Sequence, residues 1–391
     1  MTEARLELRA GAASRPITPP IGTPLGGYAA RQGRPSIAVH DELYARAVVL
    51  EQSGRRFALV SCDLVGITRD VRARVADLLA PLGIGPTDLL LAATHTHSGS
   101  GALARDRLAE AVMGKFKPNL LDYTLDAVAE AVAEAVTRLE PVTLKTASGV
   151  APGFACNRRQ PEGPNDPTIG LLSLERSQGA PVAWLTSFGA HPTLLGPDNL
   201  AISRDWPGPL VDCLKHFSGA DEVLFLNAAA GDQRPCAREE TEAFAGVEAF
   251  GIALCERYAE VAKGLYELPT SAFGTRFTEL PVTAPGAALF ERTAALVQTV
   301  GLGSVVLLAL PGEVSCELGL AFRQGAKSLG FTNACLVSLA NDHLGYLLSP
   351  EDYAQGGYEA KMAFFGPDAG NQMIAAGLEQ AAILAREAGL I

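Results

Sequence analysis

One order of secondary structure occurs three times along this chain of 391 residues. Each copy consists of a β-hairpin, a helix, a second strand and a closing helix, over about residues 43–147, 168–281 and 304–388. The hairpins are predicted from alternating apolar residues around a short turn, and the second strands from unbroken apolar runs. Strands that alternate with helices indicate an α/β fold with mixed sheets. We expect a single domain over residues 1–391, with a third copy that is shorter than the others.

The expected elements follow from periodicity and turn signals. In the first copy they are a hairpin at 43–61, a helix capped by Thr68, a strand at 88–93, a helix at 119–139 and a strand near 141–147. In the second they are a hairpin at 168–187, a helix near 207–217, a strand at 223–226 and a helix near 240–263. In the third they are a strand at 304–310, a helix to about 328, a strand at 334–339 and a final helix near 370–388.

The bulk composition excludes several classes of protein. A net charge of -11 argues against nucleic acid or an anionic membrane as a partner, because both require a basic surface. No apolar run reaches the length of a membrane span, and residues 1–5 lack a signal-peptide pattern. The seven cysteines contain no Cys-x-x-Cys pair and are interpreted as scattered core thiols. We therefore expect a cytoplasmic protein, and the sequence leaves its oligomeric state open.

Two of the six histidines, His95 and His97, lie directly after the apolar run at 88–93. Side chains alternate along an extended chain, so these two imidazoles point to the same side at the strand end. A pair of this kind is a common beginning of a metal site. Hydrogen-bonded loop histidines are the alternative interpretation.

Polar residues occupy matched positions in the three copies. Just past one strand stand Asp63, His191 and Glu313, and just past the other stand His95, Asp232 and Asn341. Ligand sites in α/β folds gather at the carboxyl ends of strands, so we expect these side chains at one edge. Two imidazoles and a carboxylate with an open position are a frequent ligand set for catalytic zinc. Ordinary turn capping also explains Asp and Asn at such positions.

The motifs of the chain resemble those of the neutral/alkaline (non-lysosomal) ceramidases, which are zinc amidohydrolases. The resemblance runs from about residue 11 to the 360s. It is carried by Leu25-Gly26-Gly27-Tyr28, Thr94-His95-Thr96-His97-Ser98-Gly99, Asn157-Arg158, Gly189-Ala190-His191, Gly231-Asp232, Pro311-Gly312-Glu313, Gly345-Tyr346, Ser349-Pro350-Glu351-Asp352-Tyr353, Gly357-Tyr358-Glu359 and Phe365-Gly366-Pro367. The order and number of these motifs indicate homology, which constrains the substrate less than the fold.

The resemblance implies zinc as the cofactor and a set of four ligands: His95, His191, Glu313 and Tyr346. It also places His97 beside the metal, where this residue is the candidate general base. Nothing in composition or spacing selects Tyr346, and ordinary loop packing of the rings is the alternative for both Tyr346 and Tyr358.

Further roles complete the predicted site. By resemblance Arg158 and Tyr358 contact the reacting group, and Gly27 lies on the substrate side. Asp63 and Asp232 are predicted to orient the ligand imidazoles, with turn capping as the alternative.

The chain also departs from the family pattern. Arg234 stands where the family has a serine in its Gly-Asp-x-Ser-Pro-Asn motif, and neither the carboxy-terminal immunoglobulin-like domain nor the secretion signal is present in the sequence. Together with Arg158, Arg159 and Arg204, this residue predicts an anionic substrate, because guanidinium groups bind carboxylate or phosphate through paired hydrogen bonds. Pairing of these arginines with neighbouring acidic residues is the alternative.

The function hypothesis is a zinc-dependent hydrolase that cleaves an amide of a small, anionic molecule by metal-activated water. An ester or a lactam is an alternative bond. A true ceramidase or lipid amidase is the second hypothesis, although a two-chain lipid is disfavoured by the lack of a membrane-docking segment. A zinc-binding pseudoenzyme that holds a ligand is the third.

Overall fold

The computed structural model describes residues 7–105, 107–236, 243–268, 273–282 and 292–391. In these ranges one unit of chain recurs three times with the same strand pairing. A hairpin is followed by a helix and by a strand that runs parallel to the second strand of the hairpin. The predicted α/β fold with repeated hairpin–helix–strand–helix units is confirmed.

Each unit forms one sheet. The first has the order β5 (Leu89–Ala93), β4 (Arg55–Cys62), β3 (Tyr44–Gln52), β1 (Leu8–Pro16) and β6 (Glu140–Pro141). The second has the order β12 (Glu222–Asn227), β10 (Ala183–Phe188), β9 (Thr168–Glu175), β7 (Thr143–Val150) and β14 (Tyr266–Glu267). The third has the order β19 (Asn333–Val337), β17 (Val305–Ala309), β16 (Ala294–Leu302) and β15 (Phe273–Pro281).

Three short strand pairs lie outside these sheets. They are β2 (Ala38–Val39) with β11 (Ala201–Ile202), β8 (Ala155–Asn157) with β13 (Gln233–Pro235), and β18 (Glu313–Val314) with β20 (Tyr346–Leu347). The last two pairs carry candidate site residues.

Two helices accompany each sheet. They are α1 (Arg69–Leu79) and α3 (Pro118–Thr137), then α4 (Pro207–Ser218) and α5 (Ala243–Ala262), then α7 (Cys316–Ser328) and α10 (Ala369–Glu387). Shorter helices are α2 (Arg107–Met113), α8 (Pro350–Ala354), α9 (Gly357–Lys361) and the 3-10 turns η1 (Ala29–Arg31), η2 (Ala80–Leu82) and η3 (Pro86–Asp88). The side chain of Thr68 accepts from the amide of Val71, as its predicted role as N-cap of α1 requires. Within the described ranges, no helix combines the length and the apolarity that a bilayer crossing needs.

The repeated unit is longer than the sequence pattern suggested. Each unit also contains a leading strand, β1, β7 or β15, which pairs antiparallel with the first strand of its hairpin. Most of the strand predicted near 141–147 therefore belongs to the second sheet as β7, and only the short strand β6 pairs with β1 of the first sheet. The third unit is complete and not shorter, because the buried strand β16 precedes β17 and joins it through Gly303, whose φ is 58°. The helix predicted near 240–263 is observed from residue 243, since residues 237–242 lie outside the described ranges.

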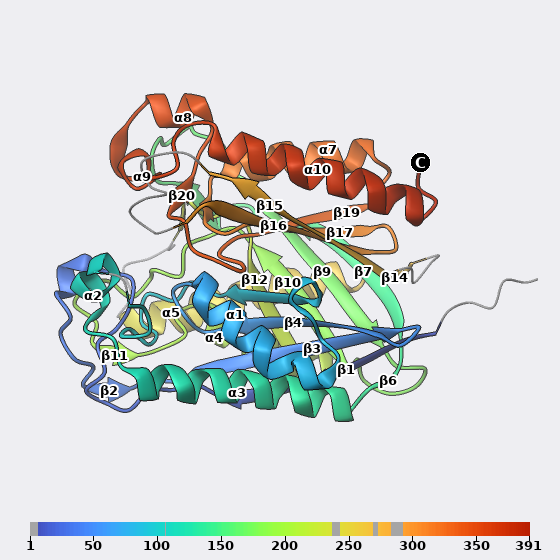
Figure 1. Ribbon diagram of the computed structural model, residues 1–391, viewed down its shortest axis with the longest axis horizontal. Helices are drawn as coiled ribbons and strands as arrows, with labels where there is room; N and C mark the ends of the chain where they lie inside the picture. The colour runs from blue at the N-terminus through green and yellow to red at the C-terminus, as the bar shows by residue number, and fades with distance from the viewer. Residues whose placement is uncertain (1–6, 106, 237–242, 269–272, 283–291) are drawn as a thin grey trace, which may run out of the picture.

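The three sheets share one apolar core. Leu50 of β3, Leu172 of β9 and Leu307 of β17 belong to the same cluster of buried side chains. Neighbouring strand residues point the other way, so that Val49 packs with α1 and α3, whereas Leu308 packs with α7 and α10. Figure 1 shows α3 along one outer face of the molecule and α10 along the opposite face, with the strands between them.

The carboxyl ends of strands from different units are joined by hydrogen bonds. Ser338 after β19 donates its amide to the carbonyl of Asn227 in β12, and the side chain of Asn227 donates to the carbonyl of Thr94 after β5. Asn341, which is fully buried, connects the third unit to the first. Its Oδ1 accepts from the amide of Leu91 at 3.1 Å, and its Nδ2 donates to Gln298 Oε1 at 2.8 Å. Asn341 is therefore a structural residue at the strand ends and lies apart from the site described below.

The substitution Asn341→Ala is expected to lower the free energy of unfolding by about 2–4 kcal/mol, because it leaves the amide of Leu91 without its acceptor and puts alanine, which tolerates the left-handed region less well than asparagine, at a φ of 69°. Denaturant titration followed by circular dichroism measures the change. The control is Asn119→Ala at an exposed position of α3. Equal effects of the two substitutions would contradict a linking role for Asn341.

Candidate active site

His95 lies in the loop that follows β5, and its backbone has a φ of 74°, which non-glycine residues seldom adopt. The residue is buried, and its Nδ1–H donates to the carbonyl of Val65 at 2.5 Å. Because the proton is held on Nδ1, Nε2 keeps a lone pair. Local hydrogen bonding thus prepares this imidazole to act as a ligand through Nε2.

His191 follows β10 and is oriented in the same way. Its Nδ1 lies 2.6 Å from the carbonyl oxygen of Ala230 and 3.0 Å from that of Gln233. Its Nε2 faces the carboxylate of Glu313, with 2.9 Å between Nε2 and Oε2. Backbone carbonyls therefore fix the tautomer of both buried imidazoles.

Glu313 and Tyr346 are direct partners in the parallel pair β18–β20, so their side chains leave the pair on the same side. Oε2 of Glu313 also lies 3.3 Å from Nε2 of His95. The hydroxyl of Tyr346 lies 3.5 Å from Nε2 of His191. The four residues that the family resemblance selected as metal ligands thus converge on one point. Their role as ligands stays a prediction.

His97 belongs to the same cluster. Its Nε2 lies 3.2 Å from Nε2 of His95, while its Nδ1 is buried without a hydrogen-bond partner among the described residues. One nitrogen from each of His95, His97 and His191 lies within 4.8 Å of the others, a grouping that could hold a metal ion. The residues present therefore fit a metal, and the geometry is compatible with His97 both as a ligand and as a base.

The electrostatics of the cluster also suit a metal. Burial, and then the charge of Arg158, lowers the pKa of His191 to about 4. Burial and the neighbouring imidazoles hold the pKa of His97 well below its usual range. Burial alone would raise the pKa of Glu313, but the adjacent histidines outweigh burial and keep it well below its usual range. Neutral imidazoles and an ionised carboxylate are the forms that bind metal ions.

Asp63 and Asp232 do not orient the imidazoles as predicted, because backbone carbonyls do so. Asp63 accepts from the amide of Tyr44 and pairs with Arg46 at 2.7 Å. Asp232 accepts from the amide of Cys316 at the start of α7 and from the side chain of Asn157. Both carboxylates cap backbone amides, which is the alternative that the sequence left open.

Arg204 and Arg234 do not occupy the predicted positions beside the substrate. All three guanidinium nitrogens of Arg204 donate to carboxylates, Nε to Asp41 and the other two to Asp212. Arg234 is exposed on β13, while Gln233 and Pro235 on either side are buried. Alternation along the strand turns Arg234 to the outside. Neither arginine is therefore placed to bind the substrate, and the argument for an anionic substrate loses two of its four arginines.

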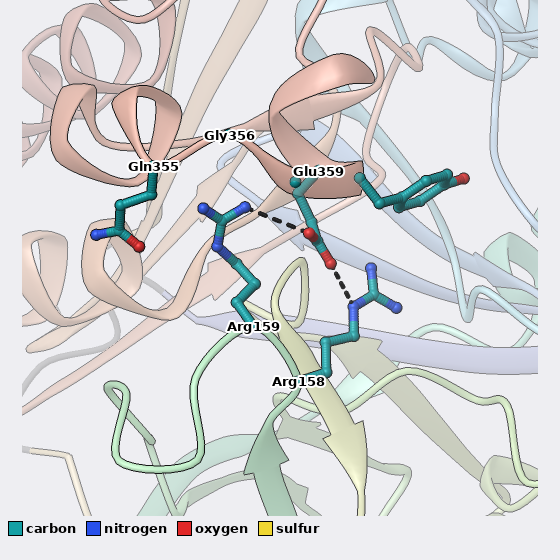
Figure 2. Close-up of a pocket in the computed structure, with 7 residues that line it drawn as sticks. Arg158, Arg159, Gln355, Gly356 and Glu359 are labelled. Atoms are coloured by element: carbon teal, nitrogen blue, oxygen red, sulfur yellow. Dashed lines mark hydrogen bonds and ion pairs between the residues drawn. The ribbon is translucent and has the colours of Figure 1, made fainter.

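Arg158 and Arg159 follow β8 and line a cavity of about 540 Å³, together with Gln355, Gly356, Gly357, Tyr358 and Glu359. Figure 2 shows the carboxylate of Glu359 between the two guanidinium groups. Arg158 Nε donates to Glu359 at 2.8 Å, and Arg158 Nη2 donates to the hydroxyl of Tyr346 at 2.8 Å. Arg159 donates to the other oxygen of Glu359 at 3.3 Å. Arg158 therefore connects the cavity to the histidine cluster.

Tyr358 lies at the mouth of this cavity, with 60% of its surface exposed. Its ring centroid is 5.8 Å from that of Tyr346, in an edge-to-face arrangement. Tyr358 is therefore placed where it could contact a substrate in the cavity. Its contact with the ring of Tyr346 also agrees with the alternative that this tyrosine only packs in its loop.

The sequence did not single out three residues that contact the site. They are Glu359, which contacts both arginines, His343, whose Nε2 lies 3.6 Å from Oε1 of Glu313, and Arg31. Arg31 is fully buried and donates to the carbonyls of Gly26 and His97. Glu359 belongs to a quoted motif, and His343 lies two residues after Asn341, so adjacency was the available signal. No local pattern marks Arg31.

Four of the seven cysteines form two disulfide pairs, which corrects the interpretation of scattered thiols. Cys156 pairs with Cys236 across β8 and β13, and Cys213 pairs with Cys255 between α4 and α5. The remaining cysteines, Cys62, Cys316 and Cys335, are buried and free. The paired cysteines are 80 and 42 residues apart in the sequence, so short motifs such as Cys-x-x-Cys do not identify them.

Comparison with known proteins gives a consistent result. Residues 9–216 match the sequence profile described as neutral/alkaline non-lysosomal ceramidase, N-terminal. The neutral ceramidase of Pseudomonas aeruginosa is 29% identical over 198 residues, which cover 46% of this chain and 29% of that protein. Neutral ceramidase A of Dictyostelium discoideum is 28% identical over 210 residues, which cover 49% of this chain and 29% of that protein. The matched part thus spans less than a third of each of these relatives.

Solved structures extend the likeness of fold. The crystal structure of neutral ceramidase from Pseudomonas aeruginosa superimposes with a TM-score of 0.89 at 20% identity, over 98% of this chain and 75% of that chain. A structure described as ceramidase complexed with C2 gives a TM-score of 0.86 at 21% identity, over 98% of this chain and 76% of that chain. At this level of identity the likeness concerns the fold.

The substitution Gly27→Ala is expected to lower the free energy of unfolding by about 1–3 kcal/mol more than backbone strain alone would, the range typical of overpacking. A β-carbon on Gly27 would lie 2.5 Å from Cγ of His97 and would displace this imidazole. Gly27 thus packs against His97, whereas the sequence assigned it to the substrate. Denaturant titration followed by circular dichroism measures the change.

Gly22→Ala is the matched control, because Gly22 has a φ of 93°, close to the 94° of Gly27, and its β-carbon would meet no atom within 4 Å. Equal losses of stability in the two variants would show that backbone strain, and not the contact with His97, determines the result.

The denatured, unreduced protein is expected to expose three free thiols, since four of its seven cysteines are paired. Titration with a chromogenic disulfide reagent measures this number. Disulfides are rare in cytosolic proteins, so three thiols would argue against the predicted cytoplasmic location. Seven thiols would contradict the pairing.

Proposed function

Because the chain belongs to the neutral/alkaline non-lysosomal ceramidase family, we propose that it is a metal-dependent hydrolase of a non-peptide amide bond. The observation that supports this proposal is the convergence of His95, His97 and His191 with the carboxylate of Glu313. Nitrogen ligands with a carboxylate and an open position are the usual arrangement for catalytic metal ions that hydrolyse amides. The arrangement lies beside a cavity, which gives a substrate access to it.

Zinc is the proposed ion, held by His95, His191, Glu313 and Tyr346. Borderline-soft Zn²⁺ accepts imidazole and carboxylate ligands. When bound, zinc supplies the Lewis acidity that activates water near neutral pH. The carbonyls of Val65 and Ala230 support this role, because they hold Nδ1–H of the two ligand histidines.

The remaining roles belong to side chains around the cluster. Burial holds the pKa of His97 well below its usual range, so the imidazole is neutral near pH 7. Its Nδ1, which has no hydrogen-bond partner among the described residues, is the proposed acceptor of a proton from water. Arg158 reaches the hydroxyl of Tyr346 and lines the cavity, where its fixed positive charge would stabilise an oxyanion. Tyr358 at the mouth of the cavity is the second proposed donor.

We propose a small, polar and anionic molecule as the substrate. Apart from Tyr358, no side chain that lines the cavity carries a large apolar surface, and the lining includes two arginines with one glutamate. An acyl chain gains affinity from an apolar lining, whereas a carboxylate gains affinity from guanidinium groups. We favour an amide as the bond that is hydrolysed. Hydrolysis of an ester or a lactam would need the same metal, base and oxyanion donors.

Ceramide is the second candidate substrate, and a neighbouring cavity favours it. This cavity of about 420 Å³ is lined by Tyr353, Ala360, Lys361, Ala363, Phe364 and Gly366. The aromatic and alanine side chains offer a surface for an acyl chain. Residues of α9 line both cavities, so an amide near Arg158 with a chain toward Phe364 is a coherent alternative.

Purified wild-type protein is expected to bind about one zinc ion per chain. His191→Ala should lose the metal, because it removes an imidazole that is fixed by two carbonyls. His97→Ala should retain much of the metal and lose turnover, if His97 acts as a base. Elemental analysis and single-turnover assays separate these outcomes, with His216→Ala on the exposed surface of α4 as the control. Loss of metal from the His97 variant would instead assign His97 as a ligand.

A substrate panel tests the chemistry. With zinc present, the wild-type protein is expected to hydrolyse short N-acyl amino acids with a higher kcat/KM than a short-chain ceramide in detergent. Mass spectrometry of the released acid and amine measures both reactions. Faster hydrolysis of the ceramide would support the lipid alternative. A lack of turnover on every amide by zinc-loaded protein would refute the proposed function.

A further inference from the structure

Glu359 is a buried carboxylate with two cationic partners. Its side chain is 8% exposed, its Oε1 accepts from Arg158 Nε at 2.8 Å, and its Oε2 lies 3.3 Å from Arg159 Nη1. Figure 2 shows the three side chains in a row, with the carboxylate in the middle. The positive charges of Arg158 and Arg159 would repel each other in this half-buried part of the protein. The carboxylate of Glu359 offsets this repulsion and stabilises both guanidinium groups.

Arg158 depends on this contact for its orientation. Its Nη2 donates to the carbonyl of Gly231 and to the hydroxyl of Tyr346, both at 2.8 Å. Its side chain is 23% exposed, which leaves it an open route to solvent. Glu359 fixes the Nε edge of the guanidinium, and the fork geometry of arginine then directs Nη2 toward Tyr346.

We propose that Glu359 is a positioning residue for hydrolysis, which acts by holding Arg158 against Tyr346 at the wall of the cavity. The inference rests on the proposed function, because it assigns to Arg158 a part in that reaction. Glu359 itself contacts neither the histidine cluster nor Glu313 in the described structure. Its effect on turnover therefore passes through Arg158.

A purely structural role is the competing explanation. Glu359 lies in α9, a helix of only five residues, and its ion pairs also attach this helix to the loop after β8. A structural role predicts a loss of stability with an unchanged kcat of the folded protein. A positioning role predicts a loss of turnover that disappears once Arg158 can no longer make both contacts.

The experiment is a double-mutant cycle between Glu359→Gln and Arg158→Lys. Glu359→Gln preserves the shape of the side chain and removes its charge, whereas Arg158→Lys retains the charge and loses the fork. In the wild-type background Glu359→Gln is expected to lower kcat about 10- to 100-fold, the range for loss of a hydrogen bond to a charged group, with unchanged zinc content. In the Arg158→Lys background the same change is expected to alter kcat less than about twofold.

Glu351→Gln is the matched control, because Glu351 is exposed on the neighbouring helix α8. Its kcat and melting temperature should equal those of the wild type. An unchanged kcat in Glu359→Gln, or an equal loss in both backgrounds, would overturn the inference while the proposed function stands.

Crystallography of Glu359→Gln provides a readout that does not require activity. The guanidinium of Arg158 is expected to leave the hydroxyl of Tyr346, and an unmoved guanidinium would overturn the inference. If the wild-type protein hydrolyses no amide of the panel, the proposed function fails, and the crystal structure alone decides whether Glu359 positions Arg158.

Discussion

Three sheets pack their inner faces on one apolar core, and the helices of each unit cover the outer face of its own sheet. Because the parallel strand pairs of the three units share this core, their carboxyl ends lie close together. The loops that follow these strands then contact one another through backbone groups, as Ser338 and Asn227 do. The polar cluster forms at this meeting point, so its geometry depends on the burial of apolar side chains far from it.

Backbone carbonyls set the chemical state of the cluster. In many metal sites a carboxylate receives the second ring proton of a ligand histidine. Here the backbone carbonyls of Val65 and Ala230 accept these protons. Asp63 and Asp232 instead accept hydrogen bonds from backbone amides. A neutral acceptor leaves the imidazole less basic than a carboxylate would. The negative charge of the cluster is concentrated on Glu313, opposite the positive charge of Arg158.

The sequence predicted the repeated units well, because hairpins and amphipathic helices are recorded in local periodicity. It missed β16 as part of the third unit, since that unit was taken to begin directly at the strand near 304–310. The convergence of His95, His191 and Glu313 was predictable from matched positions in the repeats. Tyr346 was accessible only through family resemblance, because its placement depends on the pairing of β18 with β20.

The environments of single charged side chains were the least predictable part. Arg204 and Arg234 look alike in the sequence, yet Arg204 is enclosed by Asp41 and Asp212, whereas Arg234 faces outward from its strand. The partners of Arg204 are set by tertiary contacts, and the direction of Arg234 is set by the register of β13 with β8. The environments of both arginines depend on contacts between segments that are distant in sequence, and local sequence patterns do not predict such contacts.

The cluster draws on all three units, with His95 from the first, His191 from the second, and Glu313 and Tyr346 from the third. A chain that lacks any one unit, because its synthesis is incomplete or because it has been cleaved, also lacks part of the cluster. This holds even where the remaining units keep their own helices and strands. A metal ion held there would favour only the fully assembled chain and would stabilise it by mass action. Retention of the ion would therefore report on the integrity of the whole molecule, and chelation would loosen the contacts between units before the core of any single one.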